Sequence, residues 1–262
     1  MISARNTLRL SRRRVMQAGL VLSASLPVMK PRLSSAAYAE TDVSNGGRMA
    51  GTVRFDGELP PFDQILISKD SHICGNGHVV PDGAEVGDDG VLTGAVVALK
   101  DVAEGKPWLN ELKSPAIVQE KCLFHPYVQV APKGAELTIT NKDPLLHNIH
   151  AYEIIGRARR TMFNIAQPQA DQVDKHMLKM RRGDVVELDC DAHNWMSAWI
   201  YTSDHPYVAV TDGAGAFAID DIPEGDFEVT IWHPLLGSLD DKVSITAGRD
   251  VAVEFTLQTS DA

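Results

Sequence analysis

Short runs of β-forming residues recur along the chain, and turn residues such as Asp56-Gly57 separate them. This pattern constrains the fold more than any other feature, because runs at this spacing are typical of sandwiches and Greek-key barrels. The sequence therefore predicts an all-β protein, although residues 171–182 could also be read as a short helix. The clearest runs are Gly51–Phe55, Ala95–Leu99, Tyr127–Val130, Glu136–Thr140, Val185–Leu188, Ala198–Tyr201, Phe227–Trp232 and Val251–Leu257.

The first 39 residues have the layout of an export signal. A basic run, Arg12-Arg13-Arg14, precedes an apolar stretch over residues 18–28 that is too short to span a bilayer. Small residues at Ala37 and Ala39 then provide a cleavage site. The basic run with its neighbours resembles a twin-arginine signal, so we expect residues 1–39 to be removed and the mature protein to be periplasmic, without stable membrane insertion.

Charge is distributed unevenly between this segment and the rest of the chain. The full sequence has a formal net charge of −10, but residues 1–39 contain seven basic residues and no acidic ones. Without them, 18 basic residues remain against 35 acidic ones, a net charge of −17. Such a surface repels phosphate backbones, so we expect no nucleic-acid partner and favour a basic partner or a cation.

Two segments far apart in the sequence carry related motifs. Gly51–Gly57 and Gly94–Asp101 resemble the opening strands of carboxypeptidase-regulatory-like domains, which are transthyretin-like β-sandwiches. Thr211–Phe217 and Pro223–Phe227 resemble the closing strands. The resemblance implies one sandwich built from residues 47–105 and 205–258, with a second domain inserted between its halves. A tandem arrangement, in which the first strands join the middle domain, is the alternative.

The segment between these halves carries a candidate metal-ligand set. His147 follows the predicted strand Glu136–Thr140, and Cys190, His193 and Met196 follow the predicted strand Val185–Leu188. One thiolate, two imidazoles and one thioether are the ligands of a blue-copper site, in which a weak axial methionine tunes the potential.

Residues 116–203 resemble the cupredoxins, Greek-key sandwiches whose short Cys-x-x-His-x-x-Met loop is seen in amicyanin. The resemblance implies a single type 1 copper held by His147, Cys190, His193 and Met196. It also implies that hydrogen bonds of Asn148 tie the two ligand loops together. The imidazole edge of His193 would then be an electron port in an apolar patch.

Other metal chemistries fit the sequence less well. Structural zinc sites use more thiolates or imidazoles and have no use for methionine. A binuclear copper centre needs a second cysteine in the loop, and multicopper oxidases need His-x-His pairs, whereas the nearest pattern here is His147-Asn-Ile-His150. We therefore expect a protein that is not an enzyme.

The three cysteines lead to a prediction about a disulfide. With Cys190 on copper, Cys74 and Cys122 are the pair left to bond in an oxidising compartment. The alternative is a buried, reduced Cys122, with Cys74 joining His72 and His78 in a second metal site. A second site from His72, His78 and His125 also remains open.

These observations support three functions, in decreasing order. The first is a carrier of single electrons, whose acidic surface would steer a basic partner such as a c-type cytochrome or a dehydrogenase. The second is a periplasmic copper-binding protein for copper tolerance or delivery. The third is a binding module, because transthyretin-like domains often mediate contacts.

Overall fold

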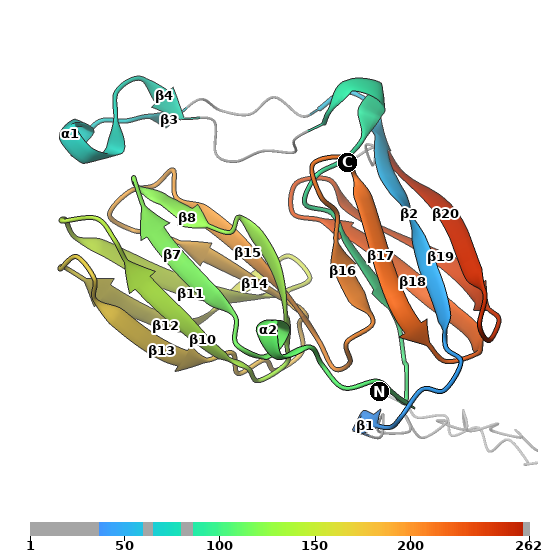
Figure 1. The fold of residues 1–262 in the computed structure, drawn as a ribbon. Helices are drawn as coiled ribbons and strands as arrows, with labels where there is room; N and C mark the ends of the chain where they lie inside the picture. Colours follow the sequence, from blue (N-terminus) through green and yellow to red (C-terminus); the bar gives the residue numbers. More distant parts are fainter. Residues whose placement is uncertain (1–36, 60–64, 80–85, 259–262) are drawn as a thin grey trace, which may run out of the picture. The chain divides into compact units, whose positions relative to one another are not determined.

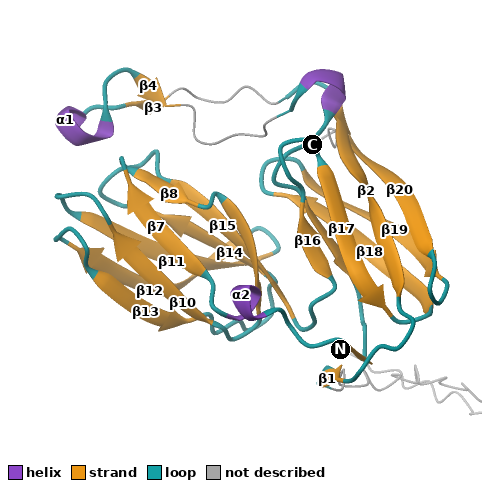
Figure 2. Ribbon diagram, in the orientation of Figure 1, coloured by secondary structure: helices purple, strands orange, loops and turns teal. Residues whose placement is uncertain are grey.

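The structure, a computed structural model, describes residues 37–59, 65–79 and 86–258. Strands make up most of these residues (Figure 2), which confirms the predicted all-β class. The helical elements are two short helices and one 3-10 turn: α1 (Ser71–Cys74), α2 (Asn110–Lys113) and η1 (Asp88–Gly90). No helix among the described residues is long and apolar enough to cross a membrane. Most of the predicted export signal, residues 1–36, lies outside the described residues.

Residues 116–203 form two sheets that we call the inner sandwich (Figure 1). The first sheet has the order β13-β10-β7-β8, with bounds β7 (Ala116–Glu120), β8 (Leu123–His125), β10 (Glu136–Asn141) and β13 (Val173–Met177). The second has the order β12-β11-β14-β15-β9, with bounds β9 (Val128–Pro132), β11 (His147–Ile155), β12 (Ala158–Gln167), β14 (Val185–Asp189) and β15 (Ser197–Ser203).

The core of the inner sandwich follows from side chains that alternate along its strands. In β10, Leu137 and Ile139 are buried between more exposed neighbours, and in β14 Val186 and Leu188 are buried in the same way. Successive side chains of a strand point to opposite faces, so each sheet presents one apolar face. These faces share one core, which extends to Cys190, Trp195 and Met196 at the end of β14 and beyond.

Part of the segment that could be read as a helix is instead a strand. Within residues 171–182, Val173–Met177 form β13, which pairs antiparallel with β10, with Ile139 opposite Asp174 and Glu136 opposite Met177. The helical interpretation was therefore wrong. Methionine and lysine permit a helix, but pairing with a neighbouring strand outweighs a weak local preference.

Strands from both ends of the chain form a second, flanking sandwich. Its sheets have the orders β17-β2-β20 and β16-β5-β18-β19, so β2 and β5 pair with strands that follow residue 207. β20 pairs in parallel with β2 over the whole length of β20, from Arg48 opposite Asp250 to Asp56 opposite Gln258. The bounds are β2 (Gly47–Asp56), β5 (Val96–Leu99), β16 (Val208–Val210), β17 (Ala216–Ile222), β18 (Gly225–His233), β19 (Gly237–Ile245) and β20 (Asp250–Gln258).

Two small paired elements complete the described chain. β1 (Ala39–Glu40) pairs with β6 (Glu104–Gly105), and the hydroxyl of Tyr38 donates to the carbonyl of Lys106. β3 (Ile65–Leu66) pairs with β4 (His78–Val79), and α1 lies between them in sequence. We call residues 65–79 the cap, because they cover part of the site described next.

Candidate metal centre

Two loops of the inner sandwich bring the predicted ligands together. The first runs from Asn141, the last residue of β10, to His147, the first residue of β11. The side-chain amide of Asn141 donates to the carbonyls of Leu145 and Gln167, and its oxygen accepts the N–H of Asp143. Asparagine folds a local turn in this way when its side chain replaces backbone partners.

The second loop connects β14 to β15 and carries ligand candidates at every third position. The N–H of His193 donates to the carbonyl of Cys190, and the N–H of Met196 donates to that of His193. The N–H of Cys190 donates back to the carbonyl of Met196, which closes the loop. Because β11 pairs with β14, with His150 opposite Asp189, the start of β11 lies beside this loop.

The donor atoms of three of these side chains face one another. The Nδ1 atoms of His147 and His193 are 3.0 Å apart, and the Sγ of Cys190 lies 3.9 and 3.8 Å from them, respectively. A first-row metal takes bonds of about 2.0 Å to nitrogen and about 2.3 Å to sulfur. Each separation is shorter than the sum of two such bonds, so one ion fits between the three atoms.

Burial completes the site. His147, His193, Cys190 and Met196 are exposed by 0%, 1%, 2% and 2%, respectively. Burial lowers the pKa values of both imidazoles below the ordinary histidine value. Both rings are therefore neutral at neutral pH, the form that binds a metal.

The thiol of Cys190 is held by opposing effects. Burial raises its pKa, while hydrogen bonds from the backbone N–H groups of Asn148, His193 and Ala192 oppose that rise. The N–H of Asn148 lies 3.5 Å from the sulfur. Groups that stabilise the thiolate favour metal binding, because the thiolate is the form that coordinates.

Asn148 joins the two loops. Its side-chain oxygen accepts the N–H of Ala192, and its amide nitrogen donates to the carboxylate of Asp191 and to the side-chain oxygen of Asn164. Asp191 and Ala192 of the Cys190 loop are thus fixed against the start of β11. Such contacts orient ligands and tune a metal centre.

A carboxylate holds each imidazole at Nε2, the nitrogen that points away from the other donors. Neither of the two aspartates that supply these carboxylates was predicted from the sequence. The Nε2 of His147 lies 2.8 Å from Oδ2 of Asp143, and the Nε2 of His193 lies 3.1 Å from Oδ2 of Asp70. A histidine that donates from Nε2 to a carboxylate presents Nδ1 to a metal and is a stronger base there. Asp143 could have been suspected from its position four residues before His147, whereas no local signal connects Asp70 to His193.

The turn at Lys121 and Cys122 links the same carboxylate to the disulfide. Both residues adopt positive φ, 52° and 58°, and both N–H groups donate to Asp143 at 2.8 Å. Successive N–H groups in such a turn form an anion-binding nest. Cys122 bonds to Cys74 in the cap, which confirms the predicted disulfide.

One expectation about the surface near the centre was wrong. The edge of His193 is buried against the cap rather than set in an exposed apolar patch. Trp195 is also buried, and its indole N–H donates to the carbonyl of Cys122. The physical reason is the cap, whose Ile65, Ile67 and Ile73 pack against the same core.

The possible second site at His72, His78 and His125 does not assemble among the described residues. All three residues are surface-accessible, and none belongs to a cluster of potential ligands there. The imidazole that approaches the disulfide is His193, which lies with Cys74 and Cys122 in a group whose donor atoms are within 4.8 Å of one another.

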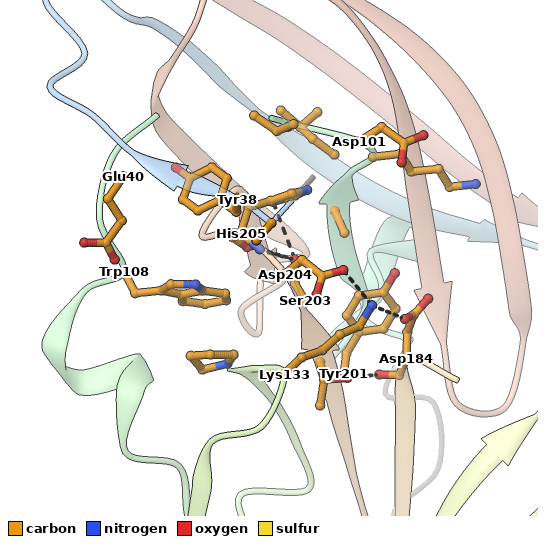
Figure 3. A pocket seen from close by; sticks show the side chains of 17 residues that line it. Tyr38, Glu40, Asp101, Trp108, Lys133, Asp184, Tyr201, Ser203, Asp204 and His205 are labelled. Carbon is orange, nitrogen blue, oxygen red and sulfur yellow. Dashed lines mark hydrogen bonds and ion pairs between the residues drawn. The ribbon is translucent and has the colours of Figure 1, made fainter. Parts of the chain in front are cut away.

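A cavity of about 730 Å³ is a separate feature (Figure 3). Within it, the Nζ of Lys133 lies 2.9 Å from a carboxylate oxygen of Asp184 and 2.8 Å from one of Asp204. None of the four predicted ligands lines this cavity. It is therefore no part of the candidate metal centre.

Known structures resemble part of the chain. A purple cupredoxin from Nitrosopumilus maritimus is 20% identical over 34% of this chain and 99% of its own, with a TM-score of 0.28. Amicyanin from Paracoccus versutus is 13% identical over 34% of this chain and 81% of its own, with a TM-score of 0.28. A copper-containing nitrite reductase from Thermus scotoductus is 13% identical over 34% of this chain but only 22% of its own, with a TM-score of 0.28. No protein-family model matches the chain, and no curated protein does.

Proposed function

We propose that the protein binds one type 1 copper ion and carries single electrons. The observation that supports this proposal is the convergence of Cys190 Sγ with the Nδ1 atoms of His147 and His193, at 3.0 to 3.9 Å. Met196, buried in the same core as Cys190, would supply the weak axial thioether. Bound copper would supply one-electron chemistry, because this ligand set accommodates both Cu(I) and Cu(II).

The residues of the chain have defined tasks in such a carrier. Asp143 and Asp70 hold the two imidazoles with Nδ1 toward the metal, and Asn148 holds the cysteine loop. Ligands that are fixed in this way rearrange little when the charge of the metal changes. Burial excludes water from the position between the three donors.

Copper explains the donor set better than zinc does. Zinc prefers four strong nitrogen, sulfur or oxygen ligands. Here two imidazoles and one thiolate converge, and the fourth nearby candidate is a thioether. Cuprous copper accepts thiolate and thioether ligands readily, so the chemistry of the donors favours copper.

Location, partner and the lack of catalysis belong to the same proposal. The layout of residues 1–39 supports export to the periplasm. The acidic remainder of the chain supports a basic redox partner, such as a c-type cytochrome or a dehydrogenase. The buried position of the centre supports a carrier rather than an enzyme, because a substrate would need direct access to the metal.

Copper tolerance or delivery without electron transfer is the second candidate. It is favoured by the Cys74–Cys122 pair, whose sulfurs lie within 4.8 Å of a nitrogen of His193 and would offer soft donors once the disulfide is reduced. The two functions differ in what leaves the protein. A carrier cycles reversibly between two copper states against a cytochrome, whereas a delivery protein transfers the metal itself to an acceptor.

The absorption spectrum of the copper-loaded protein tests the proposal. Thiolate-to-Cu(II) charge transfer from Cys190 should give an intense visible band, and Cys190→Ser should abolish it. His147→Ala should change the band by opening a ligand position, whereas His125→Ala, the same change at an exposed histidine of β8, should leave it. A band that survives Cys190→Ser would refute the centre.

A further inference from the structure

The cap is attached to the metal centre in three ways. Its apolar side chains Ile65, Ile67, Ile73 and Val79 pack against the core that contains Cys190. Its Cys74 is bonded to Cys122 of the inner sandwich. Its Asp70 contacts the Nε2 of His193. The cap is therefore part of the wall of the centre.

Asp70 has a conformation that ordinary helix capping does not explain. It precedes α1 with a φ of 52°, in the left-handed region, and its side chain makes no capping hydrogen bond. Left-handed conformations cost free energy for residues other than glycine, and they gather where a site requires them. The carboxylate of Asp70 instead points to His193.

His193 lies close to three sulfur atoms. Its Nδ1 lies 3.8 Å from Sγ of Cys190, and its Nε2 points to Asp70 of the cap. The sulfurs of Cys74 and Cys122 and a nitrogen of His193 lie within 4.8 Å of one another. One imidazole thus lies close both to the thiol of Cys190 and to a pair of cysteines that can change oxidation state.

We propose that Cys74, Cys122 and His193 form a Cu(I) uptake site when the disulfide is reduced. This inference deepens the proposed function, since it concerns how copper reaches the same centre. Two thiolates and one imidazole are soft donors that select Cu(I) over harder cations. His193 belongs to both candidate ligand sets, so copper bound to the cysteine pair would already be held by one ligand of the centre.

The two electrons that reduce the Cys74–Cys122 disulfide come from a dithiol reductant of the disulfide-reductase class. A reductant thiolate attacks one sulfur of the Cys74–Cys122 bond, and a mixed disulfide forms. The second thiol of the reductant then attacks the mixed disulfide and releases the second cysteine of the protein. The reductant leaves as a disulfide, and Cys74 and Cys122 gain the two electrons and two protons that the reductant loses. Cu(I) then displaces the thiol protons.

The disulfide state closes the same route. Cys122 and His193 are both buried in this state, and the sulfurs are bonded to each other rather than free to bind a metal. Reduction removes the covalent link between cap and inner sandwich, leaving Asp70 and the apolar contacts. The oxidation state of one cysteine pair thus controls both the ligands and access to the centre.

Cu(I) binding by the Cys190→Ser protein tests the inference directly. In this background Cys74 and Cys122 are the remaining cysteines. The protein is reduced, freed of reductant without oxygen and titrated with Cu(I) held by a chromophoric chelator. The reduced form should bind a single Cu(I) ion, with X-ray absorption showing sulfur and imidazole nitrogen ligands, and the disulfide form should bind none there. Equal binding by the two forms would overturn the proposal.

Histidine variants assign the nitrogen ligand. In the reduced Cys190→Ser protein, His193→Ala should weaken Cu(I) binding roughly tenfold or more. His72→Ala and His78→Ala, matched changes at surface-accessible residues of the cap, should leave it unchanged. Weakening by a cap variant but not by His193→Ala would place the site elsewhere.

The rate of copper loading distinguishes uptake through the two thiolates from faster entry that results only from loosening of the cap. The apo form of the wild-type protein is exposed to Cu(I) for timed intervals, freed of unbound copper and then oxidised with ferricyanide, which converts bound Cu(I) to Cu(II). The visible Cu(II) band should develop at shorter intervals after reduction than with the disulfide intact, a comparison that needs no substitution. The double variant Cys74→Ala/Cys122→Ala lacks both the link and the thiolates, and it should stay slow. If it loads as fast as the reduced wild type, the thiolates are not ligands. Absence of the band in every form, with Cu(I) still bound by reduced Cys190→Ser, would refute the proposed function but not the uptake site.

Discussion

A carboxylate oxygen of Asp70 lies 3.1 Å from Nε2 of His193, although 123 positions separate the two residues in the sequence. Asp143 makes the equivalent contact to His147 at 2.8 Å. Both imidazoles of the candidate centre therefore have an anionic partner on the side away from the metal. The Cys74–Cys122 disulfide links the cap, which supplies Asp70, to the turn at Cys122. The N–H of Cys122 in that turn donates to Asp143, so the two carboxylates are connected through the disulfide.

Substitution of Asp70 by asparagine should raise the reduction potential of bound copper. The substitution keeps the size and the tolerance for positive φ but removes a negative charge that favours Cu(II) over Cu(I). It should also weaken copper retention about tenfold, as is typical when a partner of a ligating histidine is lost. Voltammetry and chelator competition measure the two effects. Asp42→Asn, the same change at an exposed position outside the cap, is the control and should alter neither.

Substitution of Met196 by leucine tests the axial ligand. Leucine has a similar volume, so the buried packing of Met196 should be kept at a cost below about 1.5 kcal/mol. Loss of the thioether donor should raise the reduction potential while copper stays bound. Voltammetry of the loaded variant is the measurement. An unchanged potential would make Met196 a core residue only and would require a different fourth ligand.

The sequence predicted the residues that meet in the inner sandwich but not what surrounds them. His147, Cys190 and His193 could be found because spaced soft donors at the ends of predicted strands carry their own chemistry. The fold that brings them together follows from alternation such as that of Leu137 and Ile139. Periodic burial is a local signal, and local signals can be read from one sequence.

The cap could not be predicted because its contacts are between residues distant in sequence. Asp70 and Cys74 belong to a short segment with little regular structure, and nothing near them indicates His193 as a neighbour. The expectation of an exposed His193 edge failed for this reason. The strand at Val173–Met177 was missed for a related reason, because its pairing with β10 is also a tertiary contact.

Thiol counting on denatured, copper-free protein checks the disulfide in solution. One reactive thiol, that of Cys190, is expected, because Cys74 and Cys122 are bonded. The closed loop spans 48 residues, and the chain-entropy model gives a crosslink of this length about 4 kcal/mol of stability. Cys74→Ala/Cys122→Ala should therefore lower the midpoint of urea unfolding. Three reactive thiols in the wild type would contradict the bond.

Glu153 predicts a dependence of stability on acid. Its side chain is buried in β11, where one carboxylate oxygen accepts the N–H groups of Arg181, Arg182 and Gly183, and the other accepts from the Arg160 guanidinium. Burial alone would raise its pKa, but these donors outweigh burial and lower the pKa from 4.5 to about 2. The folded state thus holds the ionised carboxylate more strongly than the unfolded state does.

The ionised carboxylate of Glu153 should contribute its full stabilisation at pH values above its pKa in the unfolded state. This stabilisation should be lost as the pH falls through the pKa of Glu153 in the folded state. A shift from 4.5 to about 2 corresponds to roughly 3 kcal/mol, lost over that window. Urea unfolding of the wild type and Glu153→Gln should differ by a constant amount near neutral pH, and the difference should shrink between these two pH values. Glu136→Gln, which removes an exposed ion pair with Lys175, should change stability by less than about 1 kcal/mol throughout. If the difference for Glu153→Gln does not vary with pH, the buried carboxyl is not ionised in the folded protein.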